Sequence, residues 1–150
     1  MDRYDTRILS TLQEEGRISW SQLAMRINLS ASACQRRVEA LLEQGIIENF
    51  TVSINEVSLG HNVKAFVAVK MDRQTPELAE NFRREVREHP QVQACHMLSG
   101  NIDFMLEVVA KDLDSFGQFI DGELLSMPAV KDASSSIVLK VVKKKRTMIS

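Results

Sequence analysis

The spacing of apolar residues changes once along this 150-residue chain, and that change constrains the fold more than any other feature. Up to residue 54, apolar side chains recur mainly at helical intervals of three and four. Beyond residue 62, strand-like runs and two further helical stretches follow one another. Residues 55–62 (NEVSLGHN) show little periodicity and contain residues that favour turns. We therefore predict one domain over 1–54, a hinge over 55–62 and a second domain over 63–150.

Three short helices are expected in the first domain. The first begins at Asp2 or Asp5, and Gly16 is expected to end it in a left-handed conformation. Ser19, with Gln22 three residues on, forms the capping-box pattern that begins the second helix. The inward faces predicted for these two helices consist of Tyr4, Ile8, Leu9, Leu12, Leu23, Ala24 and Ile27.

The third helix begins at Ser30, after the break INLS, and Gly45 closes it. The segment 46–54 then alternates polar and apolar residues, which is typical of a strand. Three short helices with a short break before the last are the layout of a helix-turn-helix DNA-binding unit. The inward face predicted for the third helix consists of Cys34, Val38, Leu41 and Leu42.

The phase of the third helix indicates which side chains face outward. With Cys34 in the core and about 100° of rotation per residue, Ser32 and Arg36 point away from the core. Gln35 and Arg37 flank them. Ser, Gln and Arg side chains bind base edges and phosphates, and the N-terminal part of a recognition helix enters the groove. A solvated face is the simpler interpretation of one such helix, and the three-helix context favours DNA contact.

Total charge neither indicates nor excludes nucleic acid as a partner. The chain has a net charge of −1, and its first 60 residues carry six basic and eight acidic side chains. Local patches decide contact with DNA, so the prediction rests on the geometry of the third helix. The basic run KKKR at 143–146 is interpreted as a solvated tail, with contact to DNA phosphates as the alternative.

The second domain has the element order β-α-β-β-α-β. Its helices begin at Pro76 and Asp112, and prolines mark where each one ends. The turn SGNID, residues 99–103, joins the second and third strands. This order predicts an α+β fold in which a ferredoxin-like antiparallel sheet carries two helices on one face. The strands are expected at Val63–Met71, Val92–Leu98, Phe104–Val109 and within Val130–Val142.

The second face of this predicted sheet needs a cover. Phe66, Ala68 and other alternate apolar side chains would be exposed there in a monomer. A second copy of the chain is the simplest cover, so we expect a homodimer formed through the sheets.

Two motifs, LSxSxCxRRVxxLxxxGxI and SGxxD, occur in this order of domains. With them, essentially the whole chain resembles the Lrp/AsnC family, also called feast/famine regulatory proteins. The resemblance implies a transcription regulator that binds double-stranded DNA and whose dimers assemble further, to tetramers or octamers. Many members are more basic where this chain has Glu39 and Ala40, which implies weaker non-specific affinity here. The resemblance implies DNA contacts at Ser30, Ser32, Ala33, Gln35, Arg36 and Arg37.

The resemblance also implies an amino-acid effector bound by the second domain, between dimers. Gly100 and Asp103 match the glycine and the acid of the family's turn. Glycine lets backbone N–H groups approach a carboxylate, and aspartate pairs with an ammonium group. A plain hairpin connection is the simpler interpretation of this turn. The effector residues implied are Ser99, Gly100, Asn101 and Asp103, with Ser134, Ser135 and Ser136 of the last strand.

Other classes of function find little support in the residues. Cys95 and His96 are neighbours on a predicted strand and point to opposite faces, so we expect no metal site. We also expect no cofactor, no catalytic residues and no enzyme, since we find no nucleophile–base pair or phosphate loop. The alternative function is a DNA-organising protein of this fold without an effector. The charged N-terminus, two cysteines and lack of a long apolar run favour a cytoplasmic protein without membrane contact.

Overall fold

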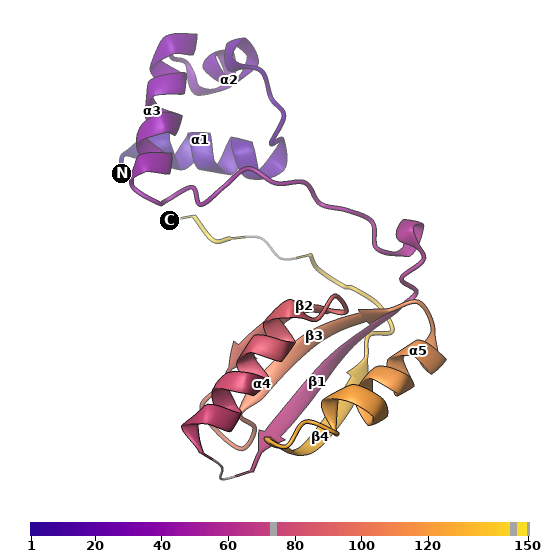
Figure 1. Cartoon of the computed structure of the whole chain (residues 1–150). Coiled ribbons are helices and arrows are strands. Elements are labelled where there is room, and N and C mark those ends of the chain that lie inside the picture. The colour runs from indigo at the N-terminus through magenta and orange to yellow at the C-terminus, as the bar shows by residue number, and fades with distance from the viewer. Residues whose placement is uncertain (73–74, 145–146, 150) are drawn as a thin grey trace. The chain divides into compact units, whose positions relative to one another are not determined.

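Two compact units make up the chain in the computed structural model, which describes residues 1–72, 75–144 and 147–149 (Figure 1). The first unit is Met1–Ile54, and the second is Asn55–Val142. The described part of the tail groups with the first unit, whereas the sequence-based division placed it in the second domain. Its residues Lys143, Thr147, Met148 and Ile149 line a shallow hollow beside Ser10 and Gln13.

Three helices form the first unit: α1 (Arg3–Glu14), α2 (Trp20–Ile27) and α3 (Ala31–Glu43). Their apolar stripes meet in one core, as the helical spacing predicts. Leu42 is the exception, because its side chain is 37% exposed rather than inward-facing. The buried core residues are Ile8, Leu23, Ala24, Ile27, Cys34, Val38 and Leu41, with Tyr4, Leu9 and Leu12 packed against them.

Side chains cap all three helices at positions that the sequence indicates. Asp2 begins α1, and Asp5 completes its capping box. Ser19 and Gln22 form the same arrangement at the start of α2, and Ser30 caps α3. Each cap accepts hydrogen bonds from backbone N–H groups that no helical carbonyl reaches.

The ends of two helices test the glycine predictions differently. After α1, the capping residue is Glu15 with a φ of −139°, and Gly16 is not among the described residues with positive φ. The predicted left-handed cap at Gly16 is therefore wrong. After α3, Gly45 follows the end of the helix, where it was expected to close it, and it has a φ of +68°. The N–H groups of Ile46 and Ile47 then both donate to the carbonyl of Leu41.

The strand predicted over 46–54 is also wrong. This segment is extended or bent, and no described strand pairs with it. Phe50, Val52 and Ile54 are all more than half exposed, so their alternation does not face a core. Alternation produces a strand only where a neighbouring strand supplies hydrogen bonds, and the described part of the chain supplies none here.

A four-stranded sheet forms the second unit, with the order β2-β3-β1-β4 and antiparallel neighbours throughout. This is the predicted α+β, ferredoxin-like arrangement. The strands are β1 (Val63–Met71), β2 (Val92–Met97), β3 (Phe104–Ala110) and β4 (Val130–Ile137). The helices are α4 (Pro76–Glu88) and α5 (Leu113–Gly117), the latter continuing as the π-helical segment η2 (Gln118–Leu124).

Both helices of this unit cover the same face of the sheet (Figure 1). Alternate residues of β1 are buried beneath them, including Ala65, Val67 and Val69. Phe82 of α4 and Phe119 of η2 are 1% exposed and fill the centre of this layer. The opposite face, which we call the open face, carries Lys64, Phe66, Ala68 and Lys70 of β1. Phe66 pairs with Glu107 of β3 and Ala68 with Met105.

Part of the predicted hinge is bound to the second unit by a hydrogen bond and an ion pair. Residues 55–62 contain a short 3-10 turn, Val57–Leu59, followed by Gly60 with a φ of +87°. The Asn62 side chain donates to the carbonyl of Lys111 at 3.2 Å. Glu56 pairs with Lys64 of β1 at 3.4 Å. These contacts hold Glu56 and Asn62 against the second unit.

Candidate DNA-binding and ligand-binding sites

The first turns of α3 present a polar surface. Cys34 and Val38 lie in the core, so the residues on the opposite side of the helix face outward. This placement agrees with the phase predicted from the sequence. Of the predicted DNA contacts, Ala33 and Arg37 are half-buried, and the exposed ones are Ser30, Ser32, Gln35 and Arg36.

These exposed side chains differ in whether they already form hydrogen bonds within the unit. Ser30 Oγ caps the start of the helix and accepts the N–H of Ala33 at 3.1 Å. Gln35 Nε2 donates to Glu39 Oε1 at 3.0 Å. Arg36 forms no hydrogen bond or ion pair with any residue that the structure describes. Its five N–H donors are therefore available to base edges or phosphates.

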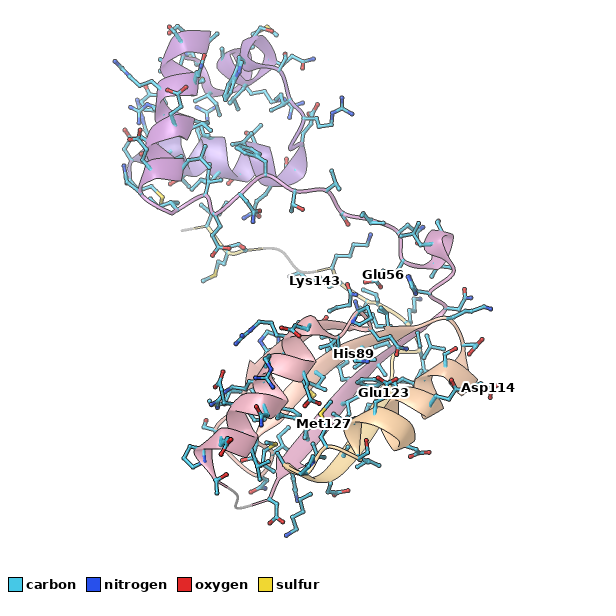
Figure 2. All side chains as sticks on the ribbon, in the orientation of Figure 1. Glu56, His89, Asp114, Glu123, Met127 and Lys143 are labelled. Carbon is cyan, nitrogen blue, oxygen red and sulfur yellow. The ribbon has the colours of Figure 1, made fainter. Side chains whose placement is uncertain are left out.

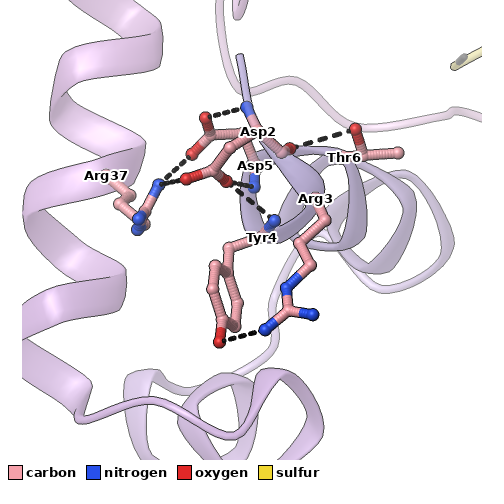
Figure 3. A network of polar contacts seen from close by, with 6 residues as sticks. All are labelled: Asp2, Arg3, Tyr4, Asp5, Thr6 and Arg37. Atoms are coloured by element: carbon pink, nitrogen blue, oxygen red, sulfur yellow. Dashed lines mark hydrogen bonds and ion pairs between the residues drawn. The ribbon is translucent and has the colours of Figure 1, made fainter.

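Arg37 has a different environment from Arg36. Its Nη1 lies 2.7 Å from Asp5 Oδ1 and 2.9 Å from Asp2 Oδ2, both at the start of α1 (Figure 3). Its guanidinium carbon lies 5.4 Å from the centre of the Tyr4 ring. Arg37 was expected on the DNA-facing surface, because helical phase does not show a contact with a residue 32 positions away.

The turn between β2 and β3 is held by three hydrogen bonds. Leu98 N–H donates to the Asp103 carbonyl, and Asp103 N–H donates to the Val69 carbonyl. Asp103 Oδ2 also accepts the N–H of Met71 at 2.7 Å. Gly100 has a φ of +134°, a conformation that glycine adopts and other residues avoid. A Cβ there would meet no described atom within 4 Å, so conformation rather than crowding explains this glycine.

A small cavity opens beside this turn, between α4 and the end of the sheet. Its volume is about 250 Å³, and Asp103 is one of its lining residues. Arg83 of α4 adds a guanidinium group, while Met97, Leu98 and Phe104 add apolar surface. The other lining residues are Met71, Asp72, Ala79 and Ala129. Sequence reasoning did not identify Arg83, which has no motif around it and reaches the cavity only through packing of α4.

The structure does not bring all predicted effector residues together. Ser99, Gly100 and Asn101 are exposed and do not line the cavity. Ser134 pairs with Ala68 and Ser136 with Phe66, so both serines lie on the open face. Ser135 pairs with Val67, on the helix-covered side. Within one chain, Asp103 is the single predicted effector residue among the described residues of the cavity.

A larger and more open hollow lies between α4 and η2. It has a volume of about 790 Å³ and is lined by Glu85, Glu88, His89, Glu123 and Met127, among others. His89 Nε2 and Glu123 Oε2 lie 2.7 Å apart across it (Figure 2). The N–H of Gln91 donates to His89 Nδ1, which leaves Nε2 as the donor to Glu123. This pair joins the two helices.

Among the described residues, no group of three or more His, Cys, Asp and Glu side chains is arranged to hold a metal ion. No helix within the described ranges is long and apolar enough to span a membrane.

Comparison with known proteins matches both units. Residues 64–148 match the model of the Lrp/AsnC ligand binding domain, and residues 1–48 match a winged helix-turn-helix DNA-binding model. The transcriptional regulator AzlB of Bacillus subtilis is 38% identical over 144 residues, 96% of this chain and 92% of that protein. The leucine-responsive regulatory protein of Escherichia coli K12 is 32% identical over 149 residues, which are 99% of this chain and 91% of that protein.

A solved structure has the same fold over nearly the whole chain. A transcriptional regulator from Neisseria meningitidis, crystallised as a complex with L-Met, has a TM-score of 0.94 and 34% identity. The match covers 99% of this chain and 96% of that one. The fold and these matches define a DNA-binding transcription regulator with a ligand-binding domain. The chain belongs to the Lrp/AsnC family.

Proposed function

We propose that this regulator responds to an amino acid with an apolar side chain, bound at the Asp103 cavity. The observation that carries the proposal is that carboxylates, a guanidinium and an apolar wall surround one small cavity. A free amino acid offers an ammonium, a carboxylate and a side chain, so each group has a counterpart. The L-Met bound by the Neisseria regulator supports this ligand class.

Asp103 and Arg83, two of the three charged residues that line the cavity, have side-chain atoms available to a ligand; the third is Asp72. Asp103 uses Oδ2 for the N–H of Met71, and no described residue donates to Oδ1. Arg83 uses Nε and Nη2 for Glu80, at 2.9 and 2.7 Å, while Nη1 has no partner among the described residues. Asp103 would hold the ammonium, and Arg83 would hold the carboxylate. The cavity volume of about 250 Å³ restricts the ligand to a small molecule.

The exposed turn contributes to the proposed site when dimers assemble. Ser99, Gly100 and Asn101 would meet the ligand when another dimer approaches, whereas Ser134 and Ser136 lie on the open face and Ser135 on the helix-covered side. Backbone N–H groups near Gly100 would then add to the carboxylate site. A ligand completed by two dimers favours tetramers or octamers and changes how many recognition helices face the DNA.

A thermal-shift screen of the twenty amino acids tests the ligand class. A ligand that binds the folded state raises the unfolding midpoint, by about 2.7 kcal/mol of stability at 100 times its Kd. We expect apolar amino acids such as methionine and leucine to raise it, and aspartate and glutamate to leave it unchanged. A flat response to all twenty would reject the proposal and favour the DNA-organising alternative.

For DNA binding, we propose that α3 enters the major groove with Ser32, Gln35 and Arg36 toward base edges and phosphates. Ser30 and Ala33 lie at the helix start, where backbone N–H groups approach a phosphate. We propose that two recognition helices in a dimer read a roughly palindromic operator. Such a protein acts in the cytoplasm, where its DNA is.

We propose that the homodimer forms through the open face of the sheet. Phe66 is 38% exposed at its centre, next to Ala68 and Met105. Phe66→Glu would bury a charge in this contact and shift micromolar protein from dimer to monomer in sedimentation experiments. Leu113→Glu, an equivalent change at a 60% exposed residue on the helix side, is the control and should stay dimeric. A fully dimeric Phe66→Glu protein would place the dimer contact elsewhere.

A further inference from the structure

The starts of α1 and α3 are linked through a cluster of charges (Figure 3). Asp2 Oδ1 accepts the N–H groups of Tyr4 and Asp5, at 2.8 and 3.0 Å, and its Oδ2 binds Arg37. Asp5 Oδ2 accepts the N–H of Asp2 at 2.8 Å, and its Oδ1 binds Arg37. Each carboxylate therefore uses one oxygen for the helix cap and the other for the same guanidinium.

Arg37 therefore contacts two carboxylates and the aromatic ring of Tyr4. Asp5 is the more enclosed of the two acids, with 15% of its side chain exposed, against 49% for Asp2. The hydrogen bond with Asp5, followed by contributions from Asp2, raises the pKa of Arg37. The pKa of Asp2 is lowered, first by the backbone hydrogen bond from Asp5 and also by Arg37. The Tyr4 ring lies against the guanidinium on another side.

The charges of the cluster do not favour a phosphate. One guanidinium faces two carboxylates, so Asp2, Asp5 and Arg37 together carry one net negative charge. Arg3, which donates to the Tyr4 hydroxyl at 3.0 Å, brings the sum for these four side chains to zero, so the cluster offers a phosphate no excess positive charge. A DNA phosphate would have to displace an acid that the capping box holds in place. Arg36, one position earlier on α3, has no such partner in the described part of the chain.

We propose that the capping carboxylates Asp2 and Asp5 withhold Arg37 from DNA, so that α3 presents Arg36 as its one free cation. Arg37 is then a positioning residue that fixes α3 against α1, and the two acids set how strongly the first unit attracts DNA of any sequence. Withholding one cation per recognition helix weakens attraction to phosphates of any sequence and leaves base contacts intact. Binding to every DNA sequence therefore weakens by a similar factor, while the base contacts of α3 continue to supply the specificity.

The test compares the salt dependence of binding to duplex DNA of random sequence. Asp2→Asn combined with Asp5→Asn removes both charges, and asparagine still accepts the capping hydrogen bonds. We expect non-specific affinity to rise and the slope of log K against log salt to steepen by about 1 for each protomer on the DNA. Arg37→Gln alone should lower the unfolding midpoint and leave that slope unchanged.

The same two substitutions in the Arg37→Gln background provide the matched control. In both backgrounds these substitutions change the net charge by the same amount. Without Arg37 there is no withheld guanidinium to release, so the slope of log K against log salt should not steepen. If the slope steepens equally in both backgrounds, the change in total charge explains the effect and the proposal is overturned. A shallower slope for Arg37→Gln in the otherwise unchanged protein would also overturn it, since Arg37 would already contact phosphate. That single variant decides the question even if the doubly substituted protein does not fold.

Discussion

Arg36→Ala is expected to weaken binding to the operator by about 1–3 kcal/mol, roughly 5- to 150-fold. Arg36 is exposed on the outer side of α3 and has no partner within the described residues. No internal contact is lost when it is removed, so fold stability should change little. A guanidinium that bonds two acceptors of one guanine supplies discrimination as well as affinity, and its loss should relax sequence preference.

The measurement uses fluorescence anisotropy with a duplex that the unaltered protein selects from a random pool, and with a scrambled duplex. Arg17→Ala is the control, because Arg17 is an exposed arginine of the same unit outside all three helices. It removes the same charge, so only Arg36→Ala should reduce the ratio of selected to scrambled affinity. Operator affinity equal to that of the unaltered protein, in a folded Arg36→Ala variant, would show that α3 does not read bases through this residue.

Local sequence signals were sufficient for most of the fold. Ser19, Ser30 and Asp112 each begin a helix because their side-chain oxygens accept backbone N–H groups a few residues on. The alternation in 63–71 predicts β1 with its observed bounds, because one side of this strand faces the helices. These features depend on residues that are close together in the sequence, so one sequence is enough to predict them.

Features that depend on distant partners were not predictable in the same way. The segment 46–54 alternates as β1 does, yet it has no neighbouring strand among the described residues and remains unpaired. Leu42 has the helical spacing of a core residue, and it lies at the edge of the stripe, where the other helices do not reach it. Periodicity shows which residues share a side of a helix, but packing decides how wide the buried stripe is.

The candidate sites show the same distinction. Helical phase separates Arg36 from the core, but it cannot show that Asp2 and Asp5 neutralise Arg37. The glycine and acid of the 99–103 turn were visible as a motif, and Arg83 was not, since it joins them only when α4 packs on the sheet. Long-range pairs of opposite charge leave no pattern in one sequence.

The contacts of Asp103 also determine how the effector proposal is best tested. Asp103→Ala would remove the acceptor for the Met71 N–H together with the negative charge, so a structural effect and a loss of ligand contact would be mixed. Gly100→Val has a similar weakness, because a φ of +134° strains any residue with a branched side chain. Asp103→Asn separates the two effects, since its amide oxygen still accepts the Met71 N–H.

We expect Asp103→Asn to weaken binding of the best ligand from the amino-acid screen by about 1.5–3 kcal/mol, roughly 10- to 150-fold. The loss follows from replacing a charge-assisted hydrogen bond to the ammonium with a neutral contact. Calorimetric titration of the full-length protein measures it directly. Asp114→Asn is the control, because Asp114 is an exposed carboxylate of α5 outside the cavity and its loss changes total charge equally.

The same variant tests how the ligand acts on the DNA. Ligand binding and assembly are linked reciprocally, so a ligand that changes the affinity between dimers must itself bind the assembled form with a different affinity. We expect the ligand to shift the sedimentation profile and the operator affinity of the unaltered protein and of Asp114→Asn. Asp103→Asn should retain basal operator binding without either shift. Unaltered ligand affinity in Asp103→Asn would remove this residue from the site, and ligand binding that changes neither assembly nor operator affinity would reject control through assembly.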